Sequence, residues 1–77
     1  MSDPIPSLRP NPILRWFAFA HLPDDLAAVS QWFAELAGRV EAELPGGAEK
    51  STALRYLLIS KDAAVRATIE GRDREQG

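Results

Sequence analysis

A chain of 77 residues is long enough for one small domain, which buries only about 60% of the surface that its unfolded form exposes. The absence of cysteine excludes a disulfide framework, an iron–sulfur cluster, a cysteine nucleophile and the usual structural zinc site. Nine lysines and arginines against eleven aspartates and glutamates make the chain mildly acidic, which argues against binding to a nucleic acid polymer. We therefore expect self-association to stabilise the domain.

The N-terminal region is rich in proline and then in aromatic residues. Residues 1–15 contain prolines at positions 4, 6, 10 and 12, and proline disfavours helical angles in the residue before it. This stretch is predicted to be an extended or disordered arm. In the segment 16–22, the alternation of Phe17, Phe19 and His21 suits an extended, strand-like piece with one face buried.

The first helix is predicted at residues 24–44. Pro23, Asp24 and Asp25 form its start signal, because aspartate oxygens can cap a helix and negative charge is favourable at its N-terminus. The letters LPGG at 44–47 end it, since proline and glycine both interrupt helices. Apolar residues recur at spacings of three and four, which indicates an amphipathic helix. This stripe comprises Leu26, Val29, Phe33, Leu36, Val40 and Leu44.

The second helix is predicted at residues 48–69, with an end at Gly71 and a frayed tail at 72–77. Its apolar face includes two lysines at helical spacing, and a neighbouring row is basic with one acidic interruption. The apolar face comprises Leu54, Leu57, Leu58, Val65 and Thr68 with Lys50 and Lys61, and the row comprises Arg55, Ile59, Asp62 and Arg66.

Two helices of similar length joined by a short turn must lie antiparallel. The chain is therefore predicted to be all-α: a helical hairpin over residues 16–71 with an extended proline-rich arm, assembling as a homo-oligomer. A hairpin has one internal interface, so the outer sides of its apolar stripes need a cover. Trp16, Phe17 and Phe19 can fold across the hairpin or reach a neighbouring subunit.

Residues that support catalysis are sparse. One histidine and no cysteine cannot form a metal cluster without carboxylates, and neither an HExxH motif nor paired acids surround His21. The serines have no histidine relay apart from His21, and the glycine pair at 46–47 lacks a P-loop or dinucleotide fingerprint. No signal peptide or long apolar run occurs, so we expect a soluble, intracellular protein that contacts no membrane. It is predicted to be a binding protein without cofactor, metal or enzymatic activity.

Cations and aromatics together suit a ligand that carries phosphates and planar bases. Basic side chains along the second helix can donate charge-assisted hydrogen bonds, and rings ahead of the first helix can stack on bases. Lys61 stands out, because an ammonium in an apolar stripe must reach solvent or pair with an anion. The alternatives are a solvated cationic face, aromatics in a core or interface, and a packing role for the histidine. The candidate ligand-binding residues are Phe17, Phe19, His21, Lys50, Arg55, Lys61 and Arg66.

Three stretches within residues 16–67 are distinctive, namely WFAFAHLPDDL, VSQWFAELA and ELPGGAEKSTALRYLLISKDAAVRA. They resemble small phage proteins of the helical-hairpin sponge family, which counter the CBASS and Thoeris immune systems. The resemblance implies a homo-oligomer, typically a hexamer, that sequesters cyclic nucleotide signals in the cytoplasm of the infected bacterium. Such signals are cyclic dinucleotides, cyclic trinucleotides or cyclic ADP-ribose isomers, and the sequence leaves the choice among them open.

The resemblance also implies where a ligand lies. In the family, ligands lie between subunits and are held by aromatics ahead of the first helix and by basic residues. Phe19, just ahead of the letters HLP, looks similar to the aromatic that stacks on a base, with Phe17 as an alternate. Some sponges bind the phosphates through a lysine on the first helix, whereas the only basic residue in the predicted first helix of this chain is Arg39. Phosphate contacts are then expected from Lys50, Arg55, Lys61 or Arg66.

A second function remains open. The acidic net charge and the absent lysine of the first helix favour a small structural or protein-interaction hairpin. Such a protein would dock on a host or phage protein through the same aromatic side chains.

Overall fold

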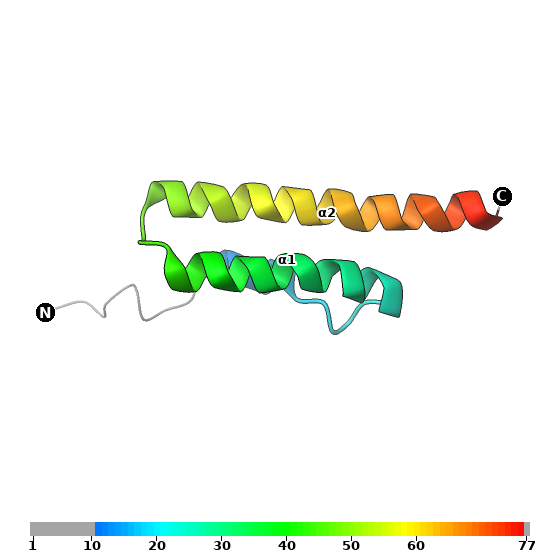
Figure 1. Ribbon diagram of the computed structural model, residues 1–77, viewed down its shortest axis with the longest axis horizontal. Coiled ribbons are helices and arrows are strands. Elements are labelled where there is room, and N and C mark those ends of the chain that lie inside the picture. The colour runs from blue at the N-terminus through cyan, green and yellow to red at the C-terminus, as the bar shows by residue number, and fades with distance from the viewer. Residues whose placement is uncertain (1–10, 77) are drawn as a thin grey trace, which may run out of the picture.

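Two long helices and one short 3-10 helix form the described part of the protein. The computed structural model describes residues 11–76, in the order η2 (Pro12–Phe17), α1 (Asp24–Glu43) and α2 (Ala48–Gln76). α1 and α2 run antiparallel, side by side, and a short turn joins them (Figure 1). The predicted all-helical class is confirmed, with no strand within residues 11–76. Assembly into a homo-oligomer stays a prediction.

Residues 12–17 are helical, where the sequence predicted part of an extended arm and the start of a strand-like segment. Asn11 caps η2, because its Oδ1 accepts a hydrogen bond from the Ile13 backbone N–H at 3.1 Å. Pro12 occupies the first position, where its fixed φ suits a helix and its missing N–H costs nothing. The prediction counted this proline only as a helix breaker and is wrong here. Residues 1–10 of the predicted arm lie outside the described residues.

Residues 18–23 lead from η2 to α1 through a turn. The Leu22 N–H donates to the Phe19 carbonyl oxygen at 3.1 Å, which closes this turn. Phe17 is buried, Phe19 is half-buried and His21 is exposed, so burial decreases along the predicted alternation. The strand-like prediction for the backbone is wrong, because a 3-10 helix and a turn occupy this segment.

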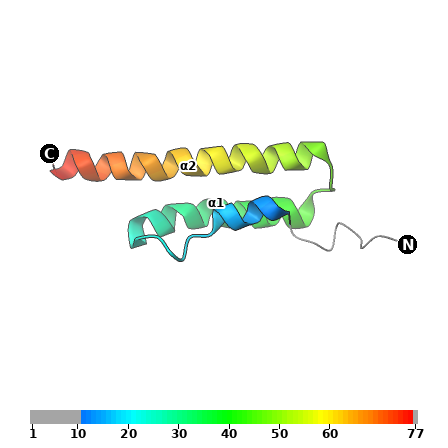
Figure 2. The ribbon, with the colours of Figure 1, turned by 180° about the vertical axis from the view of Figure 1, so that it is seen from behind.

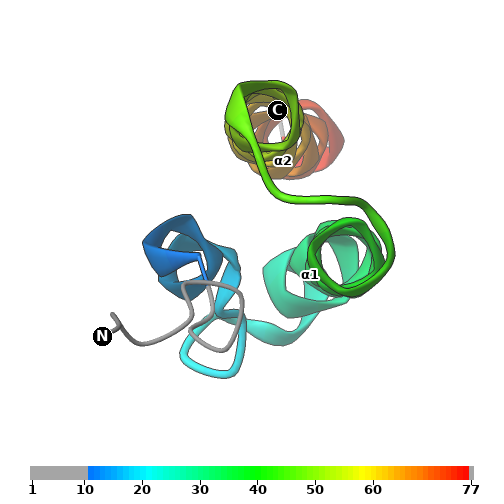
Figure 3. The same cartoon turned by 90° about the vertical axis from the view of Figure 1, so that its left-hand side faces the viewer.

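η2 lies along α1 and contacts both long helices (Figure 2). Viewed along the helix axes, the three elements stand at the corners of a triangle (Figure 3). The core lies between them: Phe17 of η2 is 3% exposed, and Ala37 of α1 and Leu54 of α2 are fully buried. η2 thus covers one open side of the hairpin, as expected for an aromatic segment that folds across it.

The buried face of α1 contains most of the predicted stripe, since Val29, Phe33 and Val40 are half-buried. Leu26 is buried, but Leu36 and Leu44 remain 48% and 46% exposed. Ser30 and Ala37 are fully buried instead. Small side chains are readily buried where helices approach closely, and a pattern of large apolar residues does not mark such positions.

The boundaries at the turn agree with the sequence, and the end of α2 does not. α1 ends at Glu43, next to the predicted end, and α2 begins at Ala48 as predicted. Gly47 has a φ of +146°, a conformation that L side chains rarely adopt, so the turn requires glycine there. α2 continues through Gly71 to Gln76, so its predicted end is wrong, and the frayed tail at 72–77 stays a prediction. A single glycine costs a helix only about 1 kcal/mol, and no proline follows it.

An ion pair holds this last part of α2 against the start of α1. The Arg72 guanidinium donates from Nε to Asp25 Oδ2 at 2.6 Å and from Nη2 to Asp25 Oδ1. Asp25 Oδ1 also accepts a hydrogen bond from the Leu26 backbone N–H at 2.9 Å. The hydrogen bonds from Arg72 hold the pKa of the Asp25 carboxyl below its ordinary value.

Asp25→Asn is expected to loosen the last turns of α2 at neutral pH and to have no such effect in strong acid. The pKa of the Asp25 carboxyl is lower in the folded protein than in the unfolded chain, where it is about 3.9. The ion pair therefore stabilises the folded state fully above that unfolded pKa, and this stabilisation is lost as the pH falls through the folded pKa. Backbone chemical shifts of residues 70–74, recorded at neutral and at acid pH, measure the change. Asp24→Asn is the matched control, since it removes the same charge from the same helix turn; equal loosening by both variants would contradict the prediction.

Candidate ligand-binding cleft

A cleft of about 420 Å³ lies between α2 and the segment formed by η2 and its following turn. This volume falls in the range of small-molecule sites, about 300–1,000 Å³. Three apolar residues complete a lining that is otherwise polar or aromatic. The polar and aromatic residues are Arg15, Trp16 and His21 on one wall and Lys61, Asp62 and Arg66 on the other.

The cleft carries positive charge although the whole chain is acidic. Its lining includes three basic residues, Arg15, Lys61 and Arg66, and a single acidic one, Asp62. Lys61 Nζ lies 3.0 Å from Asp62 Oδ1, and the Lys61 side chain is only 12% exposed. The two arginines form no ion pair within residues 11–76. Lys61 thus neutralises the one carboxylate, and the two guanidinium groups supply the net charge of the cleft.

Trp16 brings an aromatic ring to the same cleft. Its side chain is 57% exposed, and the guanidinium carbon of Arg15 lies 5.0 Å from the centroid of its ring. This is a cation–π contact, which contributes about 0.5–1 kcal/mol at an exposed site. The contact places the guanidinium group over the indole, and much of Trp16 stays open to solvent.

Of the seven residues predicted to bind a ligand, the cleft brings together three: His21, Lys61 and Arg66. Phe17 is buried in the core, so its ring presents no free face on this chain. Phe19 is half-buried and does not line the cleft, and Arg55 lies exposed on α2 outside it.

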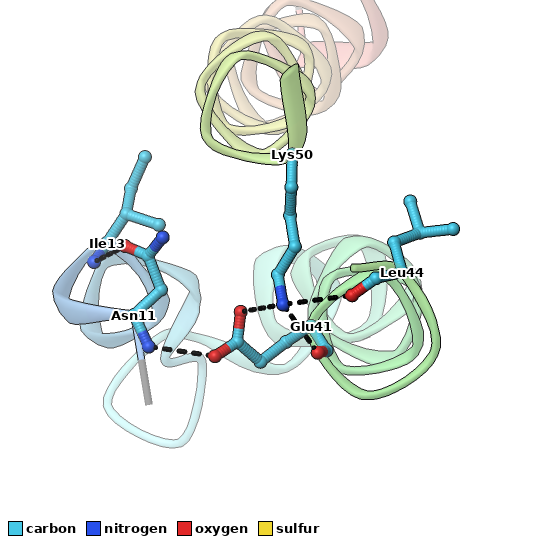
Figure 4. Close-up of polar contacts among 5 residues, drawn as sticks. All are labelled: Asn11, Ile13, Glu41, Leu44 and Lys50. Atoms are coloured by element: carbon cyan, nitrogen blue, oxygen red, sulfur yellow. Dashed lines mark hydrogen bonds and ion pairs between the residues drawn. The ribbon is translucent and has the colours of Figure 1, made fainter. Parts of the chain in front are cut away.

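Lys50, the remaining candidate, joins three elements of the fold. Its Nζ donates to the backbone oxygens of Glu41 at 2.8 Å and Leu44 at 3.2 Å, and lies 3.3 Å from Glu41 Oε1 (Figure 4). Glu41 Oε2 accepts a hydrogen bond from the Asn11 backbone N–H at 3.0 Å. This lysine clamp, formed by Lys50, Glu41 and Asn11, ties the start of α2 to the end of α1 and to the cap of η2.

Sequence reasoning missed Arg15 and took Trp16 only as a packing residue. A predicted extended arm gave Arg15 no fixed position, and η2 is what carries both side chains to the cleft. The pair Asn11-Pro12 is the signal that could have revealed this, because a capping residue followed by proline is typical of a helix start.

No family model, no curated protein and no solved structure matches this chain. Within residues 11–76, neither long helix contains the length of apolar sequence that crossing a membrane would need. The same part of the chain holds no group of three histidine, cysteine or acidic side chains that could bind a metal ion. The chemistry of the cleft is therefore the basis for assigning a function.

Proposed function

We propose that the protein is a non-catalytic binder that sequesters a cyclic nucleotide signal in an infected bacterium. The observation that carries this proposal is one cleft that combines unpaired guanidinium groups from two elements with an exposed indole ring. Phosphates require charge-assisted donors, and bases require flat faces on which to stack. The resemblance of residues 16–67 to phage sponge proteins supports the same ligand class and an anti-CBASS or anti-Thoeris role.

We further propose that the active form is a homo-oligomer, with a hexamer as the form that the resemblance implies. Large apolar side chains on the outer surfaces of both long helices support association: Trp32 is 64% exposed on α1, and Tyr56 and Ile59 are 63% and 53% exposed on α2. Burying such side chains between subunits removes apolar surface from water, at about 25 cal/mol per Å². Native mass spectrometry at micromolar concentration tests this, and a spectrum containing only monomer would refute it.

The ligand is tested by thermal unfolding with a panel of cyclic dinucleotides, cyclic trinucleotides and cyclic ADP-ribose isomers. A ligand at about 100 times its Kd stabilises the folded state by about 2.7 kcal/mol. We expect one class in the panel to raise the melting temperature, and Arg66→Gln to weaken that effect. Arg55→Gln removes the same charge from the same helix outside the cleft and should behave like the parent. An assembled parent protein that binds no member of the panel refutes the proposal for these ligands.

The same exposed apolar side chains also favour a second candidate, a hairpin that docks on a host or phage protein. That function needs Trp32 or Tyr56 but does not need the cations of the cleft. It therefore predicts a parent protein that is stabilised by no cyclic nucleotide and is insensitive to Arg66→Gln.

A further inference from the structure

We propose that Arg15 and Arg66 form an anion clamp, in which guanidinium groups from opposite walls of the cleft hold one phosphate group and Trp16 positions Arg15. The inference rests on the proposed function in taking the cleft as the ligand site. It adds the atoms that bind the phosphate, and it assigns a role to two residues that the sequence pattern did not mark as ligand-binding.

The first step concerns which cations are free. A carboxylate inside the cleft would repel a phosphate, and Asp62 is such a group. Lys61 pairs with it at 3.0 Å, so the two charges cancel locally. Arg15 and Arg66 have no ion-pair partner within the described residues and remain available for an anion of opposite charge.

The second step concerns geometry. The Arg15 guanidinium carbon lies 5.0 Å from the centroid of the Trp16 ring. A guanidinium group stacked on an aromatic face donates hydrogen bonds from its edge, so such a contact is compatible with Arg15 donating to a phosphate. Stacking also orders the long side chain before a ligand arrives, which reduces the entropy lost on binding. Two guanidinium edges in one cleft can each donate paired hydrogen bonds to phosphate oxygens.

The third step concerns rigidity of the wall that carries Arg15. η2 is held on one side by the Asn11–Glu41 hydrogen bond at 3.0 Å and on the other by Phe17, which is 3% exposed in the core. Arg66 lies on α2, which contacts η2 directly. The backbone positions of Arg15 and Arg66 are therefore set by packed elements and not by a free loop.

The test uses the full-length protein and inorganic pyrophosphate, observed through the side-chain Nε–H signals of arginine by NMR. We expect the signals of Arg15 and Arg66 to shift, while those of Arg39, which is paired with Glu43 at 3.2 Å, and of Arg55 stay in place. R15Q and R66Q should each weaken pyrophosphate binding about tenfold or more, as expected for hydrogen bonds to a charged group. R55Q makes the same charge change outside the cleft and should bind like the parent. Equal weakening by all three variants would show that pyrophosphate responds only to the overall charge of the protein, and it would overturn the anion clamp.

The positioning role of Trp16 has its own readout. W16F keeps an aromatic face and should retain binding, whereas W16L should weaken it with an unchanged circular dichroism spectrum. R15K keeps the charge but loses the planar group, so it should also weaken binding, and it decides the question if W16L does not fold. Parent-like binding by R15K overturns the proposal. Pyrophosphate held by the clamp without any cyclic nucleotide bound would refute only the proposed function. Cyclic nucleotides bound equally by R15Q and the parent would refute only the clamp.

Discussion

Phe17→Ala is expected to lower the free energy of unfolding by about 3–5 kcal/mol, the usual cost of truncating a buried phenylalanine. Phe17 is 3% exposed and meets Ala37 and Leu54, so its ring joins η2 to both long helices. Small domains have total stabilities near the lower end of about 5–15 kcal/mol, so the variant should retain only about 2 kcal/mol or less. Urea titration followed by circular dichroism measures the change.

Phe19→Ala and Tyr56→Ala are the matched controls for this prediction. Phe19 is half-buried, so Phe19→Ala should lower the free energy of unfolding less than Phe17→Ala does. Tyr56 is 63% exposed, so Tyr56→Ala should change the free energy of unfolding of the monomer by at most about 0.5 kcal/mol. The resemblance to sponge proteins gave Phe17 a role against a base instead. A Phe17→Ala protein that unfolds at the same urea concentration as the parent but no longer binds the ligand would support that role and contradict the core assignment.

The helix boundaries at the turn could be predicted because their signals are local. Aspartates at 24 and 25 follow a proline, and the LPGG turn contains Gly47 with its positive φ, so the start of α1 and the turn depend on a few adjacent residues. The end of α2 was predicted wrongly because it depends on a distant contact. α2 continues past Gly71, where Arg72 meets Asp25, a residue 47 positions away in the chain. No local pattern encodes such a pair.

The cleft could be predicted only in part for the same reason. Residue type and spacing alone singled out His21, Lys61 and Arg66, because a lone histidine and basic residues along one helix are visible in the sequence. Arg15 reaches the cleft only because η2 folds across the hairpin, and η2 is held there by tertiary contacts of Phe17 and Asn11. A short 3-10 helix has little stability of its own, so composition gives a weak signal for it.

Lys50 was chosen as a ligand-binding candidate by charge, and its surroundings indicate a structural role. The Lys50 side chain is 14% exposed and that of Glu41 is 21% exposed, so water screens their interaction only in part. Glu41 belongs to the last turn of α1 and Leu44 is the residue that follows the helix. Carbonyl groups at a helix C-terminus lack helical partners, and a cation is favourable there. The lysine clamp therefore serves as the C-terminal cap of α1.

Lys50→Met is expected to lower the free energy of unfolding by about 1–3 kcal/mol while leaving ligand affinity unchanged. Methionine keeps most of the apolar stem but removes the cation beside Glu41 Oε1 and the donor of two carbonyl oxygens. Urea titration of Lys50→Met, Glu41→Gln and the double variant measures the coupling, and the double variant should cost less than the sum of the two single ones. Lys61→Met is the control, because Lys61 pairs with the exposed Asp62 of its own helix and should affect binding more than stability. A Lys50→Met protein that unfolds like the parent but no longer binds the ligand would contradict the structural role of Lys50 and support a role in ligand binding.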